Sequence, residues 1–122
     1  MESFDWVTAI AECSVICVFK ELEEGIKADV EARSAIRAPG EPLFVFVSEV
    51  DTERVAVLHG DQSVVFSHTD RTIAVENGDG CIAMEAAPIL DFVGRCRLKV
   101  GDQELTLHEF RRAALEALFF EA

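Results

Sequence analysis

Apolar and polar residues alternate most regularly over residues 54–84, RVAVLHGDQSVVFSHTDRTIAVENGDGCIAM. Alternation with a period of two is typical of half-buried β-strands, and clusters of Gly, Asp and Asn divide this stretch into short runs. The pattern begins just upstream, in residues 43–50. It therefore predicts consecutive antiparallel strands at 43–50, 54–60, 63–68, 71–77 and 81–87.

Three two-residue turns would place the apolar residues of these strands on one face. We expect these turns at Asp61 and Gln62, at Thr69 and Asp70, and at Gly78 and Asp79. Residues directly opposite one another in antiparallel strands point to the same side of the sheet. The turns then pair Val57 with Phe66, Phe66 with Ile73, Val64 with Val75, Val75 with Ile82, and Ile73 with Met84. Four strands therefore share one predicted core face.

A helix is predicted before the strands, over residues 3–24, with Ser3 as its N-cap and Asp5 in its first turn. Its helical pattern continues to Ser34 beyond Gly25. Because a straight helix of this length would measure about 45 Å, we expect a bend near Gly25. The segment around Pro39 and Pro42 ends the helical structure.

A second helix is predicted at the C-terminal end of the chain. Thr106 and Glu109 have the spacing of a capping box, and Leu105 and Phe110 that of a hydrophobic staple. Its predicted core stripe is Phe110, Ala114, Ala117 and Leu118, and Arg112 is expected to pair with Glu116 on the solvent side.

A sixth strand and a short return are predicted between residues 95 and 105. They place Lys99 opposite Glu104 and Leu98 opposite Leu105. The sequence as a whole predicts a single α+β domain over residues 1–122. Its parts are an N-terminal helix, an antiparallel β-meander of five to six strands, and a C-terminal helix packed on the sheet.

Composition excludes several classes of function. Half of the residues are hydrophobic, which is typical of a globular rather than a disordered chain. The formal net charge of −12 disfavours binding to nucleic acid or to an anionic membrane surface. The chain has no apolar stretch long enough for a membrane span and no basic, secretory type of N-terminus, so we expect a cytoplasmic protein.

The four cysteines are Cys13, Cys17, Cys81 and Cys96. None forms a CxxC pair, and no His stands at zinc-ligand spacing, so a metal site is not expected. Cys81 is predicted on the outer face of the sheet and Cys96 on the core face, while Cys13 and Cys17 lie one helical turn apart. We therefore expect four free thiols.

No catalytic or cofactor-binding constellation stands out. Residues 78–83, GDGCIA, match a loose dinucleotide-binding pattern, but a strand rather than a helix follows them, so no cofactor is expected. His59 and His68 each begin an H-x-D triplet. The predicted hairpin places them at opposite ends, where each would cap an edge of the core. They remain the candidate residues for a small-molecule pocket between the curled sheet and the N-terminal helix.

Two apolar surfaces lack an obvious cover within one chain. The outer face of the sheet carries Ala56, Leu58, Val65 and Ala74, with Cys81 and Ala83 beside them, and the N-terminal helix carries a second stripe of Trp6, Ile10, Cys13 and Cys17. Both sets are candidate partner-binding residues, and a homodimer or a protein partner would bury them. The alternative is that the two helices pack on opposite faces of the sheet.

We therefore expect a non-catalytic, self-associating protein-binding module. Its size, acidity and helix-flanked sheet are similar, at the level of the fold alone, to small acidic chaperones of bacterial secretion and to some toxin-immunity proteins. No motif of either class is present. The alternative function is a small-molecule-binding protein or enzyme that uses the pocket beside His59 and His68.

Overall fold

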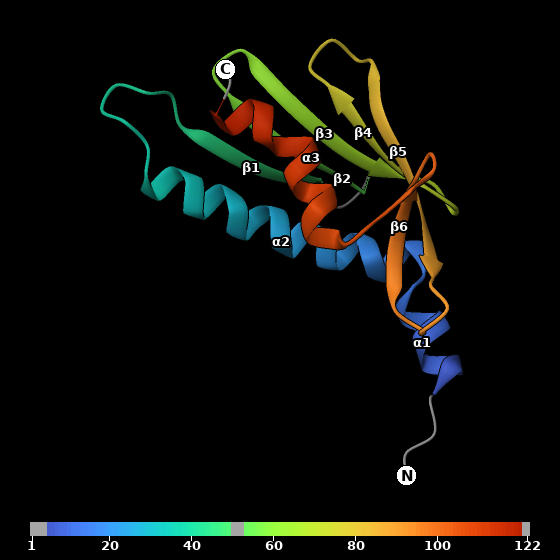
Figure 1. Cartoon of the computed structure of the whole chain (residues 1–122). Helices are drawn as coiled ribbons and strands as arrows, with labels where there is room; N and C mark the ends of the chain where they lie inside the picture. The colour runs from blue at the N-terminus through green and yellow to red at the C-terminus, as the bar shows by residue number, and fades with distance from the viewer. Residues whose placement is uncertain (1–4, 50–52, 121–122) are drawn as a thin grey trace.

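A computed structural model describes residues 5–49 and 53–120 of the chain. In these residues two helices precede a seven-stranded antiparallel sheet and one helix follows it (Figure 1). The elements are α1 (Trp6–Glu12), α2 (Val15–Ala35), β1 (Phe44–Glu49), β2 (Arg54–His59), β3 (Gln62–His68), β4 (Ile73–Asn77), β5 (Ile82–Leu90), β6 (Cys96–Val100), β7 (Gln103–Leu105) and α3 (Leu107–Phe120). The predicted α+β class is confirmed.

The sheet is a meander in which every strand pairs with its neighbour in the chain, in the order β1 to β7. The strand count is seven rather than five to six, because the short return after β6 is itself paired as β7. The predicted pairs of Lys99 with Glu104 and of Leu98 with Leu105 are confirmed.

The predicted hairpin registers are wrong by two residues. Val57 lies opposite Val64, Phe66 opposite Val75, and Val75 opposite Met84. Turn chemistry explains the first two shifts: Gly60 adopts a φ of +62°, which moves the first turn to Gly60 and Asp61. In the second turn, Oγ1 of Thr69 accepts hydrogen bonds from the backbone N–H groups of Arg71 and Thr72.

A shift of two residues leaves each side chain on its predicted face, because the side-chain period of a strand is two. Val55, Val57, Val64, Phe66 and Val75 are accordingly buried. Ile82 is the exception, with 59% of its surface exposed. The register changes between Val75 and Glu76, so Ile82 lies opposite Glu76 instead of on the core face.

The predicted helix breaks at Ser14 and not near Gly25. The Oγ of Ser14 accepts a hydrogen bond from the backbone N–H of Cys17 and so caps α2, which then runs unbroken through Gly25 to Ala35. The carboxylate of Asp5 caps α1 by accepting from the Thr8 N–H, so Asp5 is the N-cap rather than a first-turn residue. The expected N-cap, Ser3, lies outside the described residues.

Gly25 has a packing role in α2. A Cβ atom at this position would lie 2.7 Å from Cζ of Arg111 on α3. Arg111 in turn donates from Nε to Oδ2 of Asp29 at 2.8 Å, which fixes its side chain across the helix pair. The absence of a side chain at residue 25 therefore lets α2 and α3 approach closely.

Both long helices lie on the same side of the curved sheet, as Figure 1 shows. Leu22 and Ile26 of α2 and Phe110 of α3 share one buried cluster with Phe66 and Ile73 of the sheet. The alternative with helices on opposite faces is therefore wrong. Around α3 the buried residues are Phe110, Leu115, Leu118 and Phe119, whereas Ala117, predicted in the stripe, is exposed.

The expectation of four free thiols is also wrong. Cys13 and Cys96 form a disulfide, with their Cα atoms 5.5 Å apart and a separation of 83 positions in the sequence. Cys96 lies two residues before Leu98 on β6 and therefore points to the same, core-facing side of the sheet. It stands at the end of the strand that meets α1, where Cys13 lies. Cys17 and Cys81 are free and exposed.

We expect oxidised, denatured protein to titrate as two thiols per chain instead of four. The Cys13→Ser variant should lose about 2–4 kcal/mol of unfolding free energy, because the disulfide closes a long loop in the unfolded chain. Its α1 amides should exchange hydrogen faster, since no residue of α1 is buried in the core. Cys17→Ser, which removes an exposed free thiol, is the matched control and should change neither value.

Candidate functional site

The side of the sheet opposite the helices carries a set of apolar side chains that we call the outer apolar face. Cross-strand pairing places Val47, Ala56 and Val65 in one row across β1, β2 and β3, and Val45 beside Leu58 in the next row. Val45 is 43% exposed and Leu58 37% exposed. The full set is Val45, Val47, Ala56, Leu58, Val65, Ala74 and Ile82.

Acidic residues interrupt the outer apolar face on β4 and β5. Val65 pairs with Glu76, and Ala74 pairs with Glu85. Because directly opposed residues share a side of the sheet, these carboxylates point outward with the apolar residues. The face is therefore an apolar patch on β1, β2 and β3 that is interrupted by carboxylates on β4 and β5.

The second predicted partner surface is divided by the helix break. Trp6 and Ile10 are exposed on α1, and Cys17 is exposed on α2, but Cys13 is buried in its disulfide. Ile10 and Cys13 line a small hollow with residues 88–90 at the end of β5. The structure therefore places this stripe beside β5, while Ala56, Leu58, Val65 and Ala74 lie on β2, β3 and β4.

His59 belongs to a polar cluster at the end of β2. Its ring stacks on the ring of Phe44, with centroids 3.9 Å apart, and its Nε2 lies 3.7 Å from Oε1 of Glu41. This buried Nε2 has no hydrogen-bond partner among the described residues. Arg33 donates from Nη2 to Oε1 of Glu41 at 2.5 Å and from Nε to the backbone O of Phe119 at 2.8 Å.

Glu41 is the anionic centre of this cluster. The Ala38 backbone N–H donates to Oε2 at 2.9 Å and is the main cause of a lowered pKa of the Glu41 carboxyl group. The positive charge and hydrogen bond of Arg33 lower the pKa further, and His59 contributes less. The cluster joins α2, the connector before β1, and the last turn of α3.

His68 lies at the other end of the β2–β3 hairpin. His59 pairs with Gln62 next to the turn, whereas His68 pairs with Ile73 at the far end of β3. The His68 ring lies 4.6 Å from that of Phe19, its Nε2 is 3.1 Å from Oε2 of Glu53, and it lines a hollow of about 210 Å³ beside α2. The two histidines therefore form separate clusters and no shared site.

Core packing fills much of the space between the sheet and α2, where the alternative function needs a pocket. Phe44 and Phe66 are buried members of the hydrophobic cluster, and Phe46 packs against it. Residues 78–83 form the β4–β5 turn and the start of β5, with Gly80 at a φ of +84°, as in ordinary hairpins. No helix follows that turn to hold a phosphate group.

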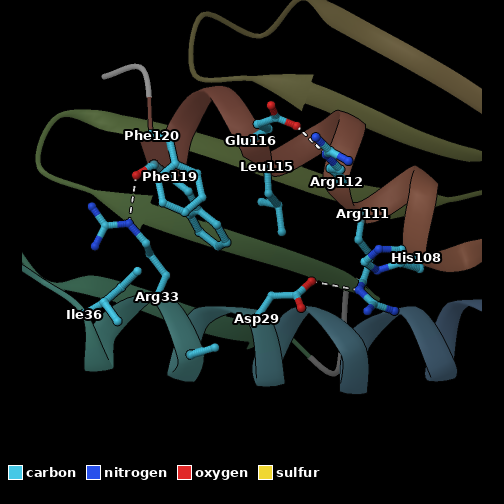
Figure 2. A pocket seen from close by; sticks show the side chains of 11 residues that line it. Asp29, Arg33, Ile36, His108, Arg111, Arg112, Leu115, Glu116, Phe119 and Phe120 are labelled. Atoms are coloured by element: carbon cyan, nitrogen blue, oxygen red, sulfur yellow. Dashed lines mark hydrogen bonds and ion pairs between the residues drawn. The ribbon is translucent and has the colours of Figure 1, made fainter.

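The sequence did not reveal a hollow between two helices that the structure forms. A groove of about 400 Å³ runs between α2 and α3, and Figure 2 shows its lining side chains. Its apolar members include Ile36, Leu115, Phe119 and Phe120, and its basic members are Arg33, His108, Arg111 and Arg112. The available signal was the concentration of basic residues at positions 108–112 of an acidic chain.

Within residues 5–49 and 53–120, no group of three or more His, Cys, Asp or Glu side chains is arranged to hold a metal ion. None of the described helices is both long enough and apolar enough to cross a membrane. No protein-family model matches the chain, and neither the curated proteins nor the solved structures contain a match to it.

We expect the Glu41 cluster to stabilise the fold at neutral pH and to lose this effect in acid. The pKa of Glu41 is lower in the folded chain, so its contribution is complete above the unfolded pKa and is lost as pH falls through the folded value. Urea unfolding should show Glu41→Gln to be less stable than the unmodified chain at pH 7, with the difference shrinking progressively as pH falls below about 4.

Glu31→Gln, on an exposed position of the same helix that carries Arg33, is the matched control. A difference between Glu41→Gln and the unmodified chain that stays constant from pH 7 to pH 3 would contradict the assigned role of the ionised carboxylate.

Proposed function

We propose that this chain is a non-catalytic protein-binding module that self-associates through the outer apolar face. One observation carries the proposal: α2 and α3 both lie on the same side of the sheet, so neither of these helices covers the other side. An antiparallel sheet with a solvated face normally alternates to polar residues there. Here the outward positions of β1, β2 and β3 include Val47, Ala56 and Val65.

The shape of this face supports packing against a second sheet. Ala56 and Val65 are small, and they lie side by side in adjacent strands. Sheets pack face to face at a separation of about 10 Å when their inner side chains are of this kind. A two-fold axis through the row of Val47, Ala56 and Val65 would place the same residues of two copies opposite one another. This is the usual geometry of a homodimer.

The alternative function, a small-molecule binder or enzyme with a pocket between the sheet and the N-terminal helical segment, has one observation in its favour. His68 lines the hollow of about 210 Å³ between α2 and the sheet, with Phe19 and Glu53. His59 does not take part, because it stacks on Phe44 at the other end of the hairpin. This second candidate therefore rests on His68 alone.

A cytoplasmic location is part of the proposal. Disulfides are rare in reducing compartments, so the Cys13–Cys96 pair makes this location testable. Alkylation of thiols inside intact cells, followed by mass spectrometry, should find Cys13 and Cys96 reduced and alkylated. Recovery of the pair as a disulfide that is protected from alkylation would assign the chain to an oxidising compartment.

Self-association is tested by placing a charge in the centre of the outer apolar face. Val65→Lys would bury an ammonium group in a dimer, while in the monomer the new side chain can pair with Glu76 across the strands. Size-exclusion chromatography with light-scattering detection should show a dimer for the unmodified chain at tens of micromolar and a monomer for the variant.

Val93→Lys introduces the same charge at an exposed residue between β5 and β6, away from this face, and should leave the dimer intact. A strict monomer of the unmodified chain at micromolar concentration, or a Val65→Lys dimer of unchanged affinity, would overturn the proposed self-association.

A further inference from the structure

The groove between α2 and α3 has a mainly apolar end, where Arg33 lies over the ring of Phe120, and a basic end. The two helices run in the same direction, since Asp29 of α2 contacts Arg111 in the second turn of α3, and Arg33, farther along α2, contacts Phe119 near the C-terminal end of α3. Figure 2 shows Ile36, Phe119 and Phe120 together at one end and His108 with Arg111 at the other. A volume of about 400 Å³ falls in the range of roughly 300–1,000 Å³ that small-molecule sites occupy.

The apolar end is exposed at its mouth. Ile36 is 67% exposed and Phe120 is 66% exposed, and the buried side chains of Leu115 and Phe119 lie next to them in the lining. None of these four residues belongs to the outer apolar face. An apolar ligand group would therefore find a hydrophobic wall here without competing with self-association.

The basic end has an unusual position on its helix. His108, Arg111 and Arg112 fall in the first two turns of α3, and the last turn of α3 contains no basic residue. Cations stabilise a helix at its C-terminus and are disfavoured at its N-terminus by the helix dipole. Glu109 in the first turn of α3 already offsets this dipole, so the side chains of His108, Arg111 and Arg112 are what make this end of the groove attractive to an anion.

The local charge differs from that of the whole chain. At the basic end of the groove, Arg111 and Arg112 stand against Asp29 and Glu116, which gives 2 − 2 = 0 with His108 neutral, while Arg33 at the other end is paired with Glu41. The chain as a whole carries −12. An anionic group therefore meets less repulsion in the groove than over most of the surface.

Arg112 is the guanidinium that a ligand can reach. Its ion pair with Glu116 spans 2.7 Å, but the side chains are 71% and 49% exposed. Such exposed pairs contribute little, so a ligand carboxylate can take the place of Glu116 at low cost. Arg111 is held more firmly by Asp29 and by its contact with Gly25.

We propose that this groove binds a small amphipathic carboxylate, a single apolar chain or ring that bears one carboxylate group. The carboxylate accepts hydrogen bonds from Arg112 and His108, and the apolar part lies along Leu115 toward Phe119 and Phe120. This site is independent of the proposed self-association, because its residues belong to α2 and α3 and not to the outer side of the sheet.

Decanoate is a suitable probe, and isothermal titration calorimetry of the full chain below the micelle concentration is the measurement. We expect one saturable site per chain. Decan-1-ol and decyltrimethylammonium, which have the same chain without the negative charge, should bind at least about tenfold more weakly, because charge-assisted hydrogen bonds are lost. Equal binding of all three would overturn the assignment of the basic end.

Two pairs of variants locate the site. Ala32→Trp fills the groove from an exposed lining position and should abolish binding, whereas Ala35→Trp, exposed on the same helix but outside the lining, should not. Arg112→Gln should weaken decanoate binding about tenfold, and Arg71→Gln, in the exposed β3–β4 turn, should not.

All four positions are surface residues, so circular dichroism should show an unchanged fold. Decanoate binding that persists in Ala32→Trp would overturn the proposal. Because Val65→Lys leaves the groove intact, that variant should bind decanoate normally even as a monomer, which keeps this test separate from the test of self-association.

Discussion

The structure depends on burying one face of a curved antiparallel meander beneath two helices. Phe66 and Ile73 from the sheet, Leu22 and Ile26 from α2, and Phe110 from α3 are all fully buried in the same cluster. Because side chains alternate strictly along a strand, the residues that supply this cluster determine which residues point the other way. The outer apolar face is therefore a direct consequence of how the core is built.

The same alternation explains how much of the fold could be predicted. Periodicity identifies strands and their inward residues, such as Val57, Val64 and Phe66, and it does so whether or not the register is right. It cannot distinguish registers that differ by two residues. Local chemistry at Gly60 and Thr69 decided between them, and the change of register at Glu76 turned Ile82 outward.

Contacts between distant segments could not be predicted from the sequence. The Cys13–Cys96 disulfide joins residues whose proximity depends on the path of every strand between them. The break at Ser14 was hidden because apolar residues continue on both sides of it. By contrast, the capping box of Thr106 and Glu109 needs only local geometry, and it is present with hydrogen bonds of 2.9 and 3.1 Å.

The candidate sites also differ in whether they depend on local sequence or on contacts between distant segments. Four residues of the outer apolar face, Ala56, Leu58, Val65 and Ala74, could be named in advance because the alternation of side chains along a strand places them there, whereas Ile82 reached it only through the change of register. The groove between α2 and α3 could not, since its lining requires two helices at opposite ends of the chain to lie side by side with Asp29 against Arg111. The separation of His59 from His68 followed from hairpin geometry and survived the two-residue shift.

The close approach at Gly25 has an evolutionary consequence. A larger residue at position 25 would collide with the guanidinium of Arg111, and Arg111 is in turn bonded to Asp29. Positions 25, 29 and 111 should therefore change together in homologous chains. Where Gly25 is replaced by a larger residue, we expect a residue shorter than arginine at position 111 and no requirement for an acidic residue at position 29.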